Sequence, residues 1–138
     1  NPEQTIEIRQ EILRPGLPIS ECIYDIDYKE DSFHIGAFYA GQLVSIATFS
    51  AETNHMLAKT KQYRLRGMAT RDKYRNLGAG RSVVKYAEKI LKSKGIELLW
   101  CNGRTGVQRY YEKLGFRPYG EVFSYPPSGP HIVMYKLL

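Results

Sequence analysis

Residues 74–81, near the middle of the chain, have the types and spacing that could hold a phosphate group. They read Tyr-Arg-Asn-Leu-Gly-Ala-Gly-Arg, with Gly78 and Gly80 separated by one residue. Glycines let the backbone approach a ligand closely, and the N–H groups and dipole at a helix start attract anions. No Gly-Lys-Ser/Thr of a Walker loop follows, and Val83 stands where the dinucleotide-binding motif has its third glycine. The sequence therefore predicts an anion-binding loop of another type; alternatively, the glycines only shape a turn.

The loop is predicted to join a strand to a helix. Apolar residues precede it up to about Thr70, and from near Arg81 they recur at helical spacing until Gly95, where a helix would end. Further helices are expected at residues 10–14 and 107–114, and strands at residues 33–39, 43–50, 61–70, 98–101, 119–123 and 132–137, with a weaker one at 5–9. This order indicates an α/β fold with a mixed sheet on which helices pack.

Two details of side-chain placement follow from these periodicities. In the strand at 61–70, three residues are expected on one face: Tyr63, Leu65 and Ala69. In the main helix, four charged residues are expected to face the solvent: Lys85, Glu88, Lys89 and Lys92.

The composition is that of a soluble globular protein, with 43% hydrophobic and 25% charged residues. The 138 residues fit one domain, residues 1–138, with one core. No apolar run is long enough to cross a membrane, and the first residues lack the basic-then-apolar pattern of a signal peptide, so none is expected. Cys22 and Cys101 lie far apart without histidines at zinc spacing, so we expect no disulfide, no metal site and a cytoplasmic location.

The net charge of +6 permits a nucleic-acid partner without requiring one. The dense part of the positive charge coincides with the anion-binding loop and comprises Arg64, Arg66, Arg71, Lys73, Arg75 and Arg81. A polyanionic small ligand explains that stretch as well as DNA does, and neither a helix-turn-helix pattern nor an aromatic-studded basic patch accompanies it. We therefore prefer a phosphate-bearing small ligand.

The loop and a second motif together resemble those of the GCN5-related N-acetyltransferases, the GNAT superfamily. The acetyl-CoA motif of that family is Arg/Gln-x-x-Gly-x-Gly/Ala between a strand and a helix, and residues 75–80 match it. Residues 110–116, Tyr-Tyr-Glu-Lys-Leu-Gly-Phe, match a helix end typical of the family. Residues 66–70, 120–123 and 129–136 are similar to the bacterial ElaA-type branch. The resemblance implies the GNAT fold, a central mixed sheet whose splayed strands hold acetyl-CoA.

The resemblance also implies how acetyl-CoA would be held. The loop would wrap the CoA pyrophosphate with Arg75, Asn76, Leu77, Gly78, Ala79, Gly80 and Arg81. The splayed strand would pair with the pantetheine arm and hold the acetyl carbonyl through Met68, Ala69 and Thr70. An N–H fixed at that carbonyl would stabilise an oxyanion. Arg104 stands where many members have an asparagine that contacts CoA, so it is expected at the pantetheine, at a phosphate or in the acceptor pocket, with Asn102 as second choice.

Tyr111 matches the family tyrosine that protonates the leaving CoA thiolate. A phenol with a pKa of about 10 holds its proton at neutral pH and can give it to a nearby thiolate. The alternative is that Tyr111 is a core aromatic residue of the helix. Tyr110 is expected to have a packing role.

The general base is not fixed by the sequence. Many family members carry a glutamate two residues before the position of Met68, and here that residue is Arg66. The candidates that remain are Glu52, His34, His55, Glu121 and His131. His131 follows a proline-rich stretch, at a place where Pro-His recurs in the ElaA-type branch, and an imidazole can accept a proton near neutral pH. His131 is therefore expected at the acceptor side as base or in the proton path; the alternatives are a structural His131 and a water chain.

These residues predict an N-acetyltransferase that moves the acetyl group of acetyl-CoA to a primary amine by direct attack in a ternary complex. Neither motif contains a cysteine, so a covalent acetyl-enzyme is not implied. The alternative is a GNAT-fold regulatory module that binds acyl-CoA with little catalysis. The acceptor is open among small amines, polyamines, amino sugars and protein amines, and edge strands are compatible with a homodimer. Four acidic residues could meet a cationic acceptor or form a solvated loop: Asp25, Asp27, Glu30 and Asp31.

Overall fold

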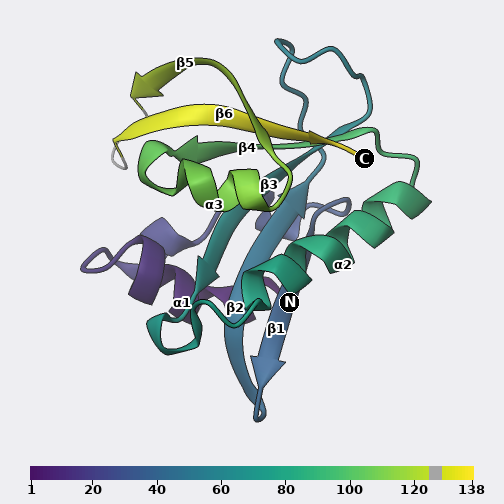
Figure 1. The fold of residues 1–138 in the computed structure, drawn as a ribbon. Helices are drawn as coiled ribbons and strands as arrows, with labels where there is room; N and C mark the ends of the chain where they lie inside the picture. The colour runs from purple at the N-terminus through teal and green to yellow at the C-terminus, as the bar shows by residue number, and fades with distance from the viewer. Residues whose placement is uncertain (125–128) are drawn as a thin grey trace.

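The computed structural model describes residues 1–124 and 129–138, and its centre is a six-stranded sheet in the order β1-β2-β3-β4-β6-β5 (Figure 1). The strands are β1 (Phe33–Tyr39), β2 (Gln42–Ser50), β3 (Gln62–Thr70), β4 (Leu98–Arg104), β5 (Arg117–Ser124) and β6 (Pro130–Leu137). The helices are α1 (Ile6–Ile8), α2 (Ala79–Ser93) and α3 (Gln108–Lys113). Shorter 3-10 or π-helical turns are Pro2–Thr5, Arg9–Leu13, Ile19–Cys22, Asp25–Tyr28, Asp72–Tyr74 and Thr105–Val107. Neighbouring strands are antiparallel except β3 and β4, which are parallel, so the predicted mixed sheet with packed helices is confirmed.

The helices and strands predicted for residues 33–137 are present in the structure, with small changes in where they begin and end. β1 and β2 form the expected hairpin, in which Ala40 and Gly41 both have positive φ, 51° and 81°. The proline-rich stretch between β5 and β6 falls largely on residues 125–128, which lie outside the described residues.

The N-terminal segment is helical, so the strand expected at residues 5–9 is wrong. A 3-10 turn leads into α1, and a π-helical turn that overlaps the short helix expected at 10–14 follows it. Ile8, with Ile12 partly buried beside it, packs against Ile46 of β2. Ile8 and Ile12 are four residues apart, so the weak alternation was the beginning of a helical apolar face.

Arg9 ties this segment to the sheet. Its side chain is fully buried, and its two terminal nitrogens bind the carboxylate of Asp27 at 2.7 and 2.9 Å. The same nitrogens donate to the carbonyl of Cys22 at 2.8 Å and to the hydroxyl of Thr48 on β2 at 2.7 Å. Burial raises the pKa of Asp27, but hydrogen bonds from Arg9 and from the N–H of Tyr24, with the charge of Arg9, outweigh burial and lower that pKa below its usual value. A guanidinium can be buried here because this set of acceptors surrounds it.

β3 changes its side-chain alternation at Gly67. Gly67 has a φ of 60°, and the register with β2 shifts beside it. Tyr63 and Leu65 belong to the core cluster under α2, and Met68 packs against that cluster, whereas Ala69 packs with α1 on the opposite face. The expectation that Ala69 shares a face with Tyr63 and Leu65 is wrong, because an extra residue at a bulge moves every later side chain to the other face.

α2 buries an apolar face and ends as expected, because Gly95 follows it with a φ of 76°. Glu88, however, is only 8% exposed, so its expected solvent position is wrong. Its Oε2 accepts from Nζ of Lys136 on β6 at 3.0 Å, and that Nζ also donates to the carbonyl of Leu114 at 2.8 Å. The ion pair with a distant strand offsets the burial of the carboxylate, and helical periodicity cannot reveal such a partner.

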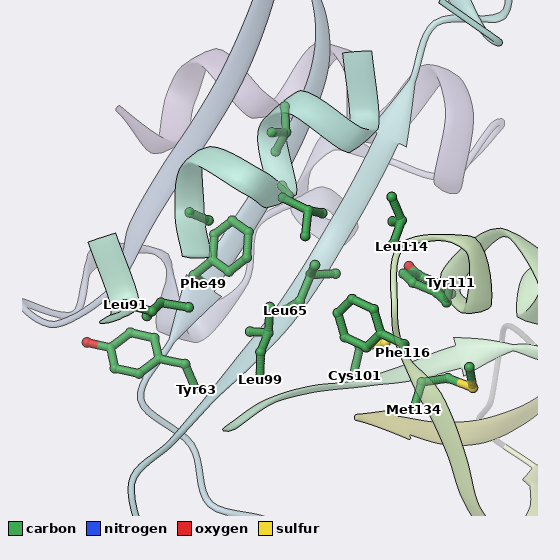
Figure 2. Close-up of a cluster of buried hydrophobic side chains, with 14 of the residues drawn as sticks. Phe49, Tyr63, Leu65, Leu91, Leu99, Cys101, Tyr111, Leu114, Phe116 and Met134 are labelled. Atoms are coloured by element: carbon green, nitrogen blue, oxygen red, sulfur yellow. The ribbon is translucent and has the colours of Figure 1, made fainter. Parts of the chain in front are cut away.

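The main core cluster lies between the sheet and the two helices α2 and α3 (Figure 2). It includes Ala47 and Leu65 from β2 and β3, and the rings of Tyr111 and Phe116 meet edge to face with centroids 5.6 Å apart. Ala47 faces this cluster, whereas its neighbour Ile46 packs with α1, so α1 lies on the opposite side of the sheet. We call the two sides the α2 face and the α1 face.

Candidate active site

β3 and β4 separate after a short paired stretch, and the opening between them is the first component of the site. Within the described residues their register consists of three pairs: Gln62–Leu98, Tyr63–Leu99 and Arg64–Trp100. Beyond Arg64, β3 continues to Thr70 alongside β2, and beyond Trp100, β4 continues to Arg104 alongside β6. The two edges that face each other there can offer backbone N–H and C=O groups to a ligand. We call this opening the split.

The predicted anion-binding loop leads from the end of β3 into α2. Gly78 has a φ of 82° and immediately precedes the first helical residue, a backbone conformation that suits glycine. The N–H of Ser82 donates to the carbonyl of Gly78 at 3.0 Å. The N–H groups of residues 79–81 therefore come before the first intrahelical bond, where an α-helix leaves donors for a ligand. A phosphate oxygen accepts such bonds and is favoured by the helix dipole.

Gly80 lets the start of α2 approach α3 and β3 closely. Gly80 is buried, and a Cβ at this position would collide with the hydroxyl of Tyr110 and lie 3.1 Å from Cε of Met68. The hydroxyl of Tyr110 therefore borders the loop at Gly80. The arrangement brings one end of the loop next to the split.

The remaining residues of the loop lie at the surface. Arg75 pairs with Asp72 at 2.9 Å, and its Nε donates to the carbonyl of Thr70 at 3.4 Å. Asn76 has a φ of 65°, Leu77 is 67% exposed, and Arg81 is exposed. The loop thus adds two arginines to the donors at the N-terminus of α2. The side chain of Ala69 on β3 packs toward the α1 face, whereas the role expected of Ala69 concerns its backbone.

A hollow of about 280 Å³ adjoins the loop on the side of the β1–β2 hairpin. Leu77, Gly78 and Ala79 form one wall. Tyr39 and Tyr74 also line it, and their ring centroids lie 5.6 Å apart. Apolar and aromatic surface therefore lies next to the loop and the start of α2.

Tyr111 lies on the α2 face beside the part of β4 that has left β3. A Cβ at Gly103 would lie 3.3 Å from the ring of Tyr111. Because Gly103 has no side chain, the ring can pack directly against β4. Gly103 comes three residues after Trp100, the last residue of β4 that pairs with β3. Burial raises the pKa of Tyr111 well above its usual value, because the phenolate would be poorly solvated. The phenol therefore keeps its proton at neutral pH, as a proton donor must.

His131 lies on the α1 face, opposite Tyr111. It is the cross-strand neighbour of Arg104, and the next residue, Ile132, joins the core cluster that contains Tyr111. Successive strand residues point to opposite faces, so the sheet separates His131 from Tyr111. Nδ1 of His131 lies 2.8 Å from the carbonyl oxygen of Gly129. A carbonyl oxygen can only accept, so Nδ1 carries the proton and Nε2 is the basic nitrogen of the neutral ring.

Arg104 also lies on the α1 face. Its Nη2 donates to the carbonyl of Leu13 at 3.2 Å, which connects the end of β4 to the N-terminal segment.

The other candidates for the general base differ in their hydrogen-bond partners and in their exposure. His34 binds the hydroxyl of Thr48 at 2.8 Å and the carbonyl of Asp27 at 3.1 Å, so it belongs to the buried network around Arg9. Glu52 is partly buried, accepts from the hydroxyl of Ser50 at 2.9 Å and lies 3.6 Å from Arg64. Two further candidates, His55 and Glu121, are exposed.

Sequence reasoning missed Tyr24, which lies on the α1 face near the split. The guanidinium carbons of Arg9 and Arg66 lie 3.9 and 4.4 Å from the centroid of its ring. A Cβ at Gly67 would lie 3.0 Å from the Tyr24 ring. Tyr24 falls in an irregular stretch with neither periodicity nor a motif, so no sequence signal marked it.

Among residues 1–124 and 129–138, no group of three or more His, Cys, Asp or Glu side chains is placed to hold a metal ion. In the same part of the chain, no helix has the length and apolar character needed to span a membrane.

Comparisons with known proteins agree with this geometry. The model of the acetyltransferase (GNAT) family matches residues 3–116. The uncharacterized N-acetyltransferase YitI of Bacillus subtilis (strain 168) is 49% identical over 136 residues, which cover 99% of this chain and 91% of YitI. Escherichia coli ElaA has a similar structure, with a TM-score of 0.76 at 18% identity, covering 97% of this chain and 88% of ElaA. An aminoglycoside 6'-N-acetyltransferase complexed with coenzyme A gives a TM-score of 0.73 at 16% identity, covering 99% of this chain and 89% of that one. The chain therefore belongs to the GNAT family of acetyltransferases.

Proposed function

We propose that this protein transfers the acetyl group of acetyl-CoA to a primary amine by direct attack within a ternary complex. The observation that carries the proposal is the split between β3 and β4, which has an anion-binding helix start at one end and a buried tyrosine beside it. The coenzyme supplies an acetyl group activated as a thioester. The loop 75–81 would hold its pyrophosphate, the hollow beside Tyr39 and Tyr74 would hold more of its nucleotide end, and the edge of β3 around Met68 would pair with the pantetheine arm.

In this proposal the proton donor and the base lie on opposite faces of the sheet. Tyr111, on the α2 face, would give its proton to the departing sulfur. The backbone near the Gly67 bulge would donate to the acetyl oxygen, where negative charge develops during attack. The amine would enter from the α1 face, where His131 could take its proton through Nε2. Tyr111 and His131 need not touch for this, because the reacting carbon would lie between them.

A GNAT-fold module that binds acyl-CoA and catalyses little is the second candidate, and Arg66 at the usual glutamate position favours it. Turnover decides between the two. Thiol release from acetyl-CoA with any class of amine supports the enzyme, and tight acetyl-CoA binding without turnover across the amine classes supports the module.

Gly78→Asp is expected to abolish acetyl-CoA binding, because it puts bulk and negative charge where the pyrophosphate would lie, and a Cβ at Gly78 meets no other atom within 4 Å. For the wild-type protein, acetyl-CoA at roughly 100 times its Kd would stabilise the fold by about 2.7 kcal/mol and raise the Tm. Calorimetry and thermal melts measure both effects. Gly95→Asp is the control: it alters a positive-φ glycine at the other end of α2, so binding should persist. Absence of both heat and thermal shift with wild-type protein in millimolar acetyl-CoA would refute the proposed function.

His131→Gln is expected to lower acetyl transfer and remove the acidic limb of the pH–rate profile, with acetyl-CoA affinity unchanged. The reason is that protonating the imidazole would remove the base at low pH. Turnover measured from pH 5.5 to about 9 gives the two profiles. If the variant loses stability while its rate per folded molecule and its profile stay the same, His131 is structural and the base is water or Glu52.

A further inference from the structure

Arg66 lies at the mouth of the split on the α1 face. It is two residues beyond Arg64, the last residue of β3 that pairs with β4, so no β4 residue is its ladder partner. Arg64 and Arg66 share a face because strand side chains repeat every two residues. Arg64 approaches Trp100 on the α1 face, with 5.1 Å between its guanidinium carbon and the ring centroid. An amine entering the split from this face would pass Arg66.

The guanidinium of Arg66 is held in place by an aromatic ring. Its carbon lies 4.4 Å from the centroid of Tyr24, and the side chain is partly buried. A cation over an aromatic face is attracted to it, and stacking leaves the N–H groups at the rim of the guanidinium able to donate. Arg66 is thereby oriented by a contact that does not neutralise its charge.

The nearby carboxylates are already occupied by other cations. Asp27, the acid of this network, is bound by both terminal nitrogens of Arg9. Glu52 lies 3.6 Å from Arg64. Arg66 forms no ion pair with any carboxylate of residues 1–124 and 129–138. Of the four acidic residues that the sequence offered for a cationic acceptor, Asp27 is buried. Asp25, Glu30 and Asp31 are exposed, and none of them forms an ion pair with Arg66.

Two arginines at the mouth of the split have no carboxylate partner among the described residues. Arg66 and Arg104 add two cations on the α1 face, and Arg104 has a neutral carbonyl as its partner, at 3.2 Å. A planar guanidinium with free edges matches the two oxygens of a carboxylate, or two oxygens of a phosphate, through paired hydrogen bonds.

We propose that the acceptor is an amine that also carries an oxyanion, either a carboxylate or a phosphate, and that Arg66 binds this group while the amine faces the split. This inference rests on the proposed function. It excludes polyamines and other polycationic amines as preferred acceptors, because Arg66 and Arg104 would repel them.

The test uses matched amines and thiol release from acetyl-CoA. Long-chain ω-amino acids are compared with their carboxamides, because in these compounds the carboxylate is too remote to change the basicity of the amine. Phosphoethanolamine is compared with ethanolamine, and spermidine represents the polycations. We expect kcat/KM to be at least about tenfold higher for an anionic amine than for its neutral match, as for loss of a hydrogen bond to a charged group. The pair with the larger ratio identifies the oxyanion as carboxylate or phosphate.

Arg66→Gln should bring that ratio near one, mainly by raising KM for the anionic amine. Arg66→Lys should retain part of the preference for the anionic amine, because lysine keeps the positive charge but cannot donate the paired hydrogen bonds of a guanidinium. Lys89→Gln, which removes one positive charge from the exposed face of α2, is the control and should leave the ratio unchanged. Acetyl-CoA affinity confirms that each variant is folded.

The result that overturns this inference is equal or greater preference for neutral or polycationic amines, or an Arg66→Gln variant with the wild-type ratio. If no amine is turned over, calorimetry on the CoA-saturated protein measures the affinity for the same amine pairs. The anionic amine should then bind more tightly than its neutral match, and Arg66→Gln should remove the difference. Loss of acetyl-CoA binding itself would instead refute the proposed function, so the two failures are distinguishable.

Discussion

Tyr111→Phe is expected to fold and to bind acetyl-CoA like the wild-type protein while its turnover falls about 10²–10⁴-fold, the usual range for a general acid. The substitution keeps the ring that packs against Phe116 and Gly103 and removes only the hydroxyl. Because burial raises the pKa of Tyr111, the phenol stays protonated across the neutral range, and the defect should not disappear on moving from pH 6 to about 8. Steady-state thiol release and calorimetry measure the two quantities separately.

Tyr63→Phe is a matched control on the same face of the sheet. Tyr63 is also buried in the core cluster, and its hydroxyl donates to the carbonyl of Asp31 at 2.8 Å, away from the split. Its loss should cost about 1 kcal/mol of stability and leave turnover unchanged. If Tyr111→Phe keeps its turnover number while chemistry limits the rate, Tyr111 only packs in the core.

Asp27→Asn is expected to produce the largest loss of stability, about 3–5 kcal/mol, because it leaves the buried guanidinium of Arg9 without its counter-ion. Urea unfolding at pH 7 measures this loss. The substitution has nearly the same shape, so packing changes little and the missing charge accounts for the effect. Glu21→Gln, which breaks a surface pair with Arg14 at 3.7 Å, is the control and should cost at most about 1 kcal/mol.

The same variant should alter the response to acid. The pKa of Asp27 is lower in the folded protein than in the unfolded chain, so its contribution is fully present above the unfolded value of about 3.9 and is lost as pH falls through the folded value. The wild-type protein should lose this contribution below about pH 4, and Asp27→Asn should not. A difference between the two proteins that stays constant down to pH 2 would show that the carboxylate contributes no such linkage.

The sequence predicted what local patterns encode. The hairpin at Ala40 and Gly41, the end of α2 at Gly95 and the loop around Gly78 each depend on residues a few positions apart, and the structure has all three. The two motifs also sufficed to predict the GNAT family, because their order and separation reflect the positions of the loop and of α3.

Other features depend on partners that are distant in the sequence. Periodicity put Glu88 in solvent, because it could not reveal Lys136 on β6. It also could not show that Arg9 is buried, because its acceptors Asp27 and Thr48 come from residues far along the chain. The ring of Tyr24 beside Arg66 belongs to the same class: its position depends on the fold of an irregular segment.

The short ladder between β3 and β4 also limits which molecules can fill the split. Among the described residues, the ladder between the sub-sheets β1–β2–β3 and β4–β6–β5 has three residue pairs, and side chains of the core also join them. A ligand between the diverging edges of β3 and β4 can form strand-like hydrogen bonds with them, but only if it is extended and carries amides along its length. A compact polyanion such as free pyrophosphate could occupy the helix start and would leave the edges unbridged. The split would therefore select acetyl-CoA by the length and the amide groups of its pantetheine arm, as well as by the charge of its phosphates.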